Sequence, residues 1–143
     1  MPDWPLPQAM REELLVVGGG LAILVGATPA SLLHRYERIA ERMLIGDFAG
    51  DIHLWRIADR KKLFTFKGHT RPVWSLAFSP DGERIVSGSF DQTAKVWEAA
   101  SGRELLTLKG HTNWLWSVAV SPQGHLIVTS SEDGTAMIWN AAT

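Results

Sequence analysis

The sequence contains no cysteine among its 143 residues. Disulfides and thiolate metal sites are therefore excluded, and a chain of this kind fits a reducing compartment, so we expect a cytoplasmic location. An excess of charge of either sign is also lacking, because 14 lysines and arginines face 15 aspartates and glutamates, for a formal net charge of −1. A balance so close to neutral gives no reason to expect binding to nucleic acid, or to an anionic membrane, through charge.

Cofactor and metal motifs are missing as well. The segment VVGGGLAI, residues 16–23, has Ile23 where a dinucleotide fingerprint needs its third glycine, and no Lys-Ser or Lys-Thr pair follows to make a phosphate-binding loop. We therefore expect neither a cofactor nor a bound metal. No metal-ligand spacing is found among the five histidines, His34, His53, His69, His111 and His125.

Repetition dominates what the sequence does contain. Residues 67–97 read KGHTRPVWSLAFSPDGERIVSGSFDQTAKVW, and residues 109–139 read KGHTNWLWSVAVSPQGHLIVTSSEDGTAMIW, an offset of 42 residues without a gap. A fixed period of about 40–45 residues is typical of a repeat architecture. The frame divides the chain into a prefix, residues 1–17, and three copies, residues 18–59, 60–101 and 102–143.

The first copy is degenerate. The histidine, the serine or threonine, and the aspartate of the later copies are replaced by Ala27, Ile45 and Ala49. Only Trp55 matches the recurring tryptophan.

The two regular copies predict short strands separated by turns. The runs are apolar and rich in β-forming residues, and the SPDG and SPQG segments supply the proline and glycine that tight turns favour. Residues 105–108 add a last strand after the second set, and the third set lacks such a strand. The other predicted strands are residues 72–78, 84–89 and 94–97 in one set and residues 114–120, 126–131 and 136–139 in the next.

A Gly-His pair, an SPDG-type turn, a turn aspartate and a tryptophan recur together, and Trp97 and Trp139 each stand 28 positions after the histidine of their copy, His69 and His111. These correlated positions resemble the blades of WD-repeat (WD40) β-propellers. The resemblance implies an all-β fold: a partial propeller of about three four-stranded antiparallel blades, the first degenerate and the third without its final strand. One departure is that the Trp-Asp dipeptide is missing, since Arg56, Glu98 and Asn140 follow the three tryptophans.

Closure of the ring raises a question of assembly. Propellers close with about 4–8 blades, and three blades cannot close. The chain is therefore expected to be a fragment or a truncated product of a larger propeller, or to assemble with copies of itself.

The resemblance also implies a buried, hydrogen-bonded tetrad in each regular copy. The same residue types could build a hydrolytic triad, but that role needs an exposed nucleophile, and a catalytic site is not expected in two adjacent repeats. We therefore expect a structural role and no enzymatic activity. The tetrads are His69, Ser87, Asp91 and Trp97 in one copy and His111, Thr129, Asp133 and Trp139 in the next.

One face of the ring carries the positions through which the family contacts its partners. The repeat itself does not require these residues, and tryptophan and phenylalanine are common anchors of binding sites. We expect a non-enzymatic protein-protein interaction scaffold that presents this aromatic face to a peptide or protein, unless the rings only pack between blades. The mapped residues are Pro72, Trp74 and Phe90, then Trp114, Trp116 and Glu132, with Phe48 in the degenerate copy.

The N-terminal hydrophobic stretch leaves an alternative. Residues 14–33 carry no charge and are long enough for a membrane helix, so a WD-repeat protein tethered to a membrane by this segment is the second hypothesis. Three consecutive glycines, residues 18–20, favour instead a hairpin in which the prefix pairs with residues 21–25. Residues 30–43 have helical spacing of apolar residues, whereas the frame places a strand and a turn there.

Overall fold

The computed structural model describes residues 42–142, and every regular element in this range is a β-strand. The strands form three antiparallel sheets in the orders β1-β2-β3, β4-β5-β6-β7 and β10-β9-β8. An all-β antiparallel fold is therefore confirmed. The strands are β1 (Arg42–Gly46), β2 (Ile52–Arg56), β3 (Lys61–Phe66), β4 (Val73–Phe78), β5 (Arg84–Ser89), β6 (Thr93–Glu98), β7 (Glu104–Lys109), β8 (Leu115–Val120), β9 (Leu126–Ser131) and β10 (Ala136–Asn140).

The sheets are offset from the sequence copies by one strand. By sequence β7 lies in the third copy, yet it pairs with β6 and completes the second sheet. The first and third sheets each have three strands within the described range, and the second has four.

Several expectations concern residues that the structure does not describe. The prefix, the hairpin with residues 21–25, the membrane segment of residues 14–33 and most of residues 30–43 lie outside the described range. Met43, at the end of the last segment, belongs to β1. Within residues 42–142, no helix is long and apolar enough to cross a membrane.

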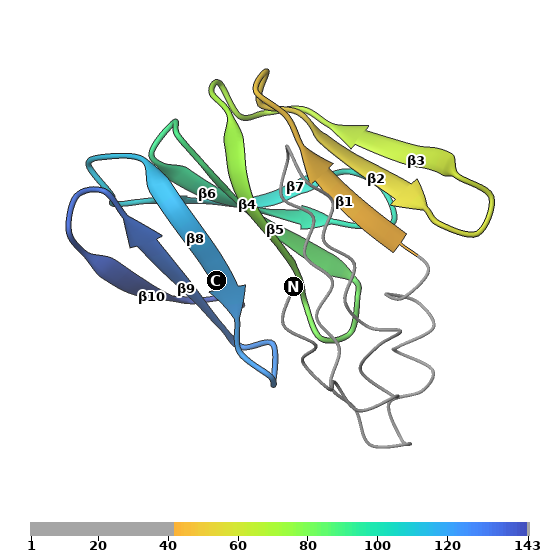
Figure 1. Ribbon diagram of the computed structural model, residues 1–143. Helices are drawn as coiled ribbons and strands as arrows, with labels where there is room; N and C mark the ends of the chain where they lie inside the picture. Colours follow the sequence, from red (N-terminus) through yellow and green to blue (C-terminus); the bar gives the residue numbers. More distant parts are fainter. Residues whose placement is uncertain (1–41, 143) are drawn as a thin grey trace, which may run out of the picture.

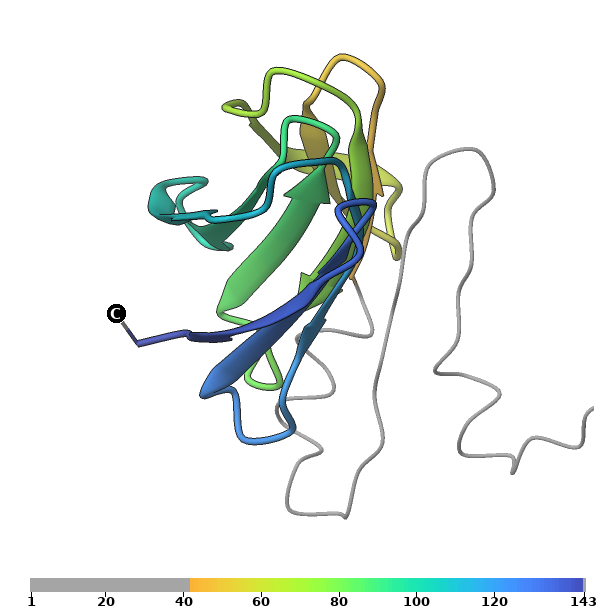
Figure 2. The ribbon, with the colours of Figure 1, turned by 90° about the vertical axis from the view of Figure 1, so that its left-hand side faces the viewer.

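The three sheets stand side by side, with the second between the other two (Figure 1). In the view of Figure 2 the third sheet faces the reader and the second lies behind it. Two apolar clusters fill the two junctions. The first cluster contains Leu44, Ile52, Leu54, Phe66, Val73, Leu76, Ile85, Trp97 and Ala99, and the second contains Val86, Ala94, Val96, Leu108, Leu115, Val118, Ile127 and Ala141.

Two glycines set the distance between neighbouring sheets. A Cβ atom on Gly46 would lie 2.7 Å from Val73 Cγ1, and a Cβ atom on Gly88 would lie 2.8 Å from Val118 Cγ1. Both distances are well inside van der Waals contact, so a side chain at either position would push the sheets apart. The two glycines are 42 residues apart, so the same position of the repeat approaches the neighbouring sheet at both junctions.

Candidate functional site

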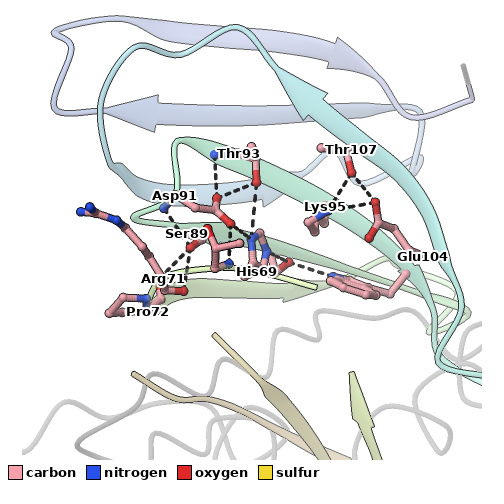
Figure 3. Close-up of polar contacts among 12 residues, drawn as sticks. His69, Arg71, Pro72, Ser89, Asp91, Thr93, Lys95, Glu104 and Thr107 are labelled. Carbon is pink, nitrogen blue, oxygen red and sulfur yellow. Dashed lines mark hydrogen bonds and ion pairs between the residues drawn. The ribbon is translucent and has the colours of Figure 1, made fainter. Parts of the chain in front are cut away.

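The tetrad residues of the second sheet form one chain of hydrogen bonds, with His69 at its centre (Figure 3). Trp97 Nε1 donates to Ser87 Oγ at 2.8 Å, and Ser87 Oγ lies 2.7 Å from His69 Nε2. His69 Nδ1 lies 2.7 Å from Asp91 Oδ2. One tautomer satisfies every bond: the serine hydroxyl donates to Nε2, and the Nδ1–H group donates to the carboxylate.

The third sheet repeats this chain with nearly the same distances. Trp139 Nε1 donates to Thr129 Oγ1 at 2.8 Å, and His111 Nε2 lies 2.8 Å from the same oxygen. His111 Nδ1 lies 2.7 Å from Asp133 Oδ2. The structure thus brings together each of the two sets of four residues that the sequence singles out.

The aspartate of each tetrad also holds the turn that carries it. Asp91 accepts hydrogen bonds from the Thr70 amide at 3.1 Å and from the Thr93 hydroxyl at 2.6 Å. Burial works against ionisation of Asp91, but hydrogen bonds from His69 and Thr93 hold the pKa of this carboxyl far below its usual range. The Asp91 carboxylate therefore stays charged down to acidic pH.

The third sheet shows the same electrostatics at its turn. A hydrogen bond from the Thr135 hydroxyl is the main cause that keeps the pKa of Asp133 far below its usual range. The Thr112 amide and His111 donate to the same carboxylate. Both turn aspartates are thus anchored anions.

Sequence reasoning missed a pair of serines that link the turn to the preceding loop. Ser89 Oγ donates to the carbonyl oxygen of Pro72 at 2.9 Å and accepts from the Asp91 amide at 3.1 Å. Ser131 Oγ donates to the carbonyl oxygen of Asn113 at 3.1 Å. The signal was present, since both serines recur at the 42-residue offset, as do the threonines that bond the aspartates.

The glycine of each Gly-His pair makes room for the tetrad tryptophan. A Cβ atom on Gly68 would lie 2.9 Å from Trp97 Cη2, and a Cβ atom on Gly110 would lie 3.0 Å from Trp139 Cη2. The recurring glycine, histidine and tryptophan therefore form one packed unit.

The hydroxyl groups of both tetrads are closed off from solvent. Ser87 and Thr129 are both 0% exposed, and each hydroxyl oxygen already accepts the tryptophan N–H. A nucleophile must reach its substrate, and these two cannot. Satisfied buried polar groups instead lock a turn onto a sheet.

The first sheet has a different set of polar contacts. His53 Nε2 lies 2.9 Å from Asp47 Oδ2, and His53 Nδ1 lies 3.1 Å from Thr65 Oγ1. Asp47 also accepts from the Asp51 amide at 2.9 Å, and its pKa is lowered because these bonds outweigh the cost of burial. Within the described residues, no group of three or more His, Asp or Glu side chains is arranged to hold a metal ion.

Four rings gather across the junction of the second and third sheets, and we call Trp74, Phe90, Trp114 and Trp116 the aromatic cluster. Phe90 is stacked between two tryptophans, with centroids 4.9 Å from Trp74 and 4.7 Å from Trp114. Trp116 stands nearly perpendicular to all three rings, at 5.8–6.5 Å. Such offset-stacked and edge-to-face pairs are the arrangements that aromatic rings prefer.

Two β-bulges position Trp74 and Trp116 of the aromatic cluster. The pairing of β4 with β5 shifts between Val73 and Ser75, and the pairing of β8 with β9 shifts between Leu115 and Ser117. Trp74 and Trp116 are the residues skipped by these shifts. Bulges re-aim side chains and are frequent beside functional sites, and here they place a tryptophan at the start of each strand with its ring partly in solvent.

The remaining residues of the predicted face lie differently. Glu132 Oε2 accepts a hydrogen bond from Trp116 Nε1 at 2.7 Å, so this carboxylate belongs to the cluster. Pro72 is half-buried, and its carbonyl oxygen accepts from the Phe90 amide at 3.0 Å. Phe48 is 70% exposed and makes none of the ring contacts found among the described residues. The structure therefore groups the face residues of two sheets and leaves Phe48 apart.

Comparison with known proteins agrees with the tetrads. The family model described as WD domain, G-beta repeat matches residues 60–98 and 102–140, which together make up more than half of the chain. No curated protein matches the sequence. Repeats of this family generally serve as protein-interaction scaffolds and are typically non-catalytic. Each matched segment contains one complete Trp–Ser/Thr–His–Asp chain, and the chain belongs to the WD40 repeat family.

Proposed function

We propose that the chain is a non-enzymatic interaction module and that the aromatic cluster is the surface that contacts a peptide or protein partner. The observation that carries this proposal is the exposure of three large rings at one place. Trp74 is 41% exposed, Trp114 38% and Trp116 40%, whereas the tetrad tryptophan Trp97 is 1% exposed. One tryptophan of the second sheet is therefore buried in the core, whereas the three tryptophans of the aromatic cluster are partly exposed at the surface.

The energetics of interfaces support this assignment. Tryptophan is enriched among the few residues that dominate binding, and truncation of such an anchor costs about 2 kcal/mol or more. The stacked rings also hold one another in place, so little side-chain freedom is lost when a partner binds. An exposed but pre-organised aromatic surface is thus suited to recognition.

The test compares a ring of the cluster with an exposed ring elsewhere. Peptides are selected from a random display library on the full chain, and their affinity is then measured for the Trp116→Ala and Phe64→Ala variants. Phe64 is a matched control, because it is 38% exposed and lies on β3, outside the cluster. Trp116→Ala is expected to weaken binding at least about 30-fold, while Phe64→Ala leaves it near wild type.

Circular dichroism completes the experiment. Trp116→Ala should retain the wild-type spectrum, because its ring is largely outside the two apolar clusters. A Trp116→Ala variant that binds normally, or that loses its fold, would show that the rings serve packing between the sheets.

A further inference from the structure

The aromatic cluster includes a carboxylate that has no counter-ion among residues 42–142. Glu132 is held by the indole N–H of Trp116 at 2.7 Å, and this is the one side-chain hydrogen bond that its carboxylate makes within residues 42–142. None of the ion pairs of the described residues includes it. One carboxylate oxygen is therefore fixed in direction, while no residue of the range 42–142 forms an ion pair with the charge.

The rings of the cluster are likewise unoccupied by any cation of the described chain. The three cation–π pairs in this range involve Phe78, Trp55 and Trp97, none of which belongs to the cluster. Both faces of Phe90 are covered by the stacked tryptophans, so Trp116 meets its edge. Trp116 nevertheless keeps 40% of its surface exposed, beside the carboxylate that its own nitrogen holds.

The loops around the cluster carry charges of both signs. Asp91 follows Phe90 directly, Asp133 follows Glu132 directly, and both aspartates are anchored anions. The basic residues of the same loops are Lys67, whose Nζ atom lies 3.3 Å from Asp51 Oδ2, and Arg71 and Lys109, which are exposed. The loops are thus balanced in charge, and the feature that favours a cation is local, the Glu132 carboxylate beside Trp116.

From this juxtaposition we infer that the aromatic cluster and Glu132 form a receptor for an arginine side chain of the peptide partner. The inference rests on the proposed function and names the chemistry that this surface recognises. The guanidinium lies on the exposed part of Trp116 and donates to Glu132. Aromatic faces carry negative charge density that attracts cations, and a charge-assisted hydrogen bond to the carboxylate fixes the position of the guanidinium.

Arginine fits this site better than lysine for geometric reasons. The guanidinium is planar and stacks on an indole while its edge donates to a carboxylate, whereas an ammonium is a point charge with stronger hydration. A purely apolar ligand fits worse than either, because it would cover Glu132 without supplying a donor, and a buried unpaired carboxylate is costly.

The experiment uses two peptide libraries that differ only in a fixed central residue, arginine in one and glutamine in the other. Both are selected on the full chain. The best arginine peptide is then compared with its citrulline analogue, which keeps the shape and loses the charge. Affinities are measured for the wild type, for Glu132→Gln, and for Glu83→Gln as control, since Glu83 is an exposed carboxylate in the β4–β5 turn at the far end of β4.

The expected result is coupling between the two charges. The arginine library yields the tighter binders, Glu132→Gln weakens the arginine peptide about tenfold, and the same variant leaves the citrulline peptide nearly unchanged, which a double-mutant cycle reports as interaction. Glu83→Gln should change neither. Melting temperatures near wild type for both variants confirm that the fold is intact.

The outcomes separate this inference from the proposed function. If the selected peptides depend on Trp116 but tolerate citrulline or glutamine in place of arginine, the aromatic surface binds peptides and the arginine receptor is wrong. If no selected peptide depends on Trp116, both proposals fail.

Discussion

The first and second sheets each join an aspartate, a histidine and a hydroxyl group by hydrogen bonds, but in different surroundings. The side chain of His69 is 0% exposed and that of Asp91 9%. In the first sheet the side chain of His53 is 21% exposed and that of Asp47 36%. The same three kinds of group are therefore buried in the second sheet and accessible to water in the first sheet.

The position of the tryptophan explains the difference. In the second sheet Trp97 covers the network and donates to Ser87. In the first sheet Ile45 occupies the place of that serine, and Trp55 is half-buried with Lys62 Nζ 5.9 Å from its ring centre. Among the described residues, no buried side-chain nitrogen or oxygen lacks a partner. A buried polar network is thus kept whole or removed whole, because a partial one leaves unpaired groups.

The largest effect that sharpens this comparison is expected at the tryptophans. Trp97→Ala should lower the free energy of unfolding by about 3–5 kcal/mol, because it opens a cavity in the first apolar cluster, and it also leaves Ser87 without its donor. Trp55→Ala should lower the free energy of unfolding clearly less, because Trp55 is only half-buried and donates no hydrogen bond to a serine. Urea denaturation measures both, and equal losses would show that the first sheet relies on its tryptophan as much as the second.

The next effect concerns the aspartate of the second sheet. Asp91→Ala should lower the free energy of unfolding by about 1–3 kcal/mol, because buried His69 loses the acceptor of its Nδ1–H group. Gln123→Ala, in an exposed turn of the third sheet, is the control and should stay within about 0.5 kcal/mol of wild type. A melting temperature for Asp91→Ala as high as that of the control would contradict a structural role for the tetrad.

The 42-residue period was sufficient to predict the strands of the second and third sheets, and the resemblance to WD repeats implied the members of the tetrads. The aromatic cluster could be foreseen only as a set of positions on one face. Two of its tryptophans, Trp74 and Trp116, are skipped by β-bulges, and a one-residue shift in strand pairing cannot be recognised from a periodic pattern of residues. The His53 contacts were also missed. The sequence comparison identified only the tetrad residues that the first copy lacks, and His53 has no counterpart in a tetrad.

A smaller effect of Asp91 is expected on the pH dependence of stability. The pKa of Asp91 in the fold lies far below the value of 3.8 expected for an exposed aspartate. The unfolded chain therefore takes up a proton first as the pH falls below about 4, and the stability that the charged form supplies is lost on the way down. Asp91→Asn should reduce the decline in melting temperature between about pH 5 and about pH 2. Some decline should remain, because Asp133 is held in the same way; a slope identical to wild type would show that Asp91 is not a linked group.

The smallest expected loss of stability is that of His53→Ala, which is compared with the loss caused by His69→Ala. His53→Ala removes the link between Asp47 and Thr65, but both partners are only half-buried, so water can take over the lost bonds. The expected loss in free energy of unfolding is about 0.5–1 kcal/mol. His69→Ala should cost more, about 1–3 kcal/mol, because Ser87 is beyond the reach of water and its hydroxyl loses an acceptor. The comparison is made by urea denaturation of the two variants at one pH. If His53→Ala is as damaging as His69→Ala, solvent access does not decide the value of these networks, and the first sheet must depend on its histidine for the turn that Asp47 organises.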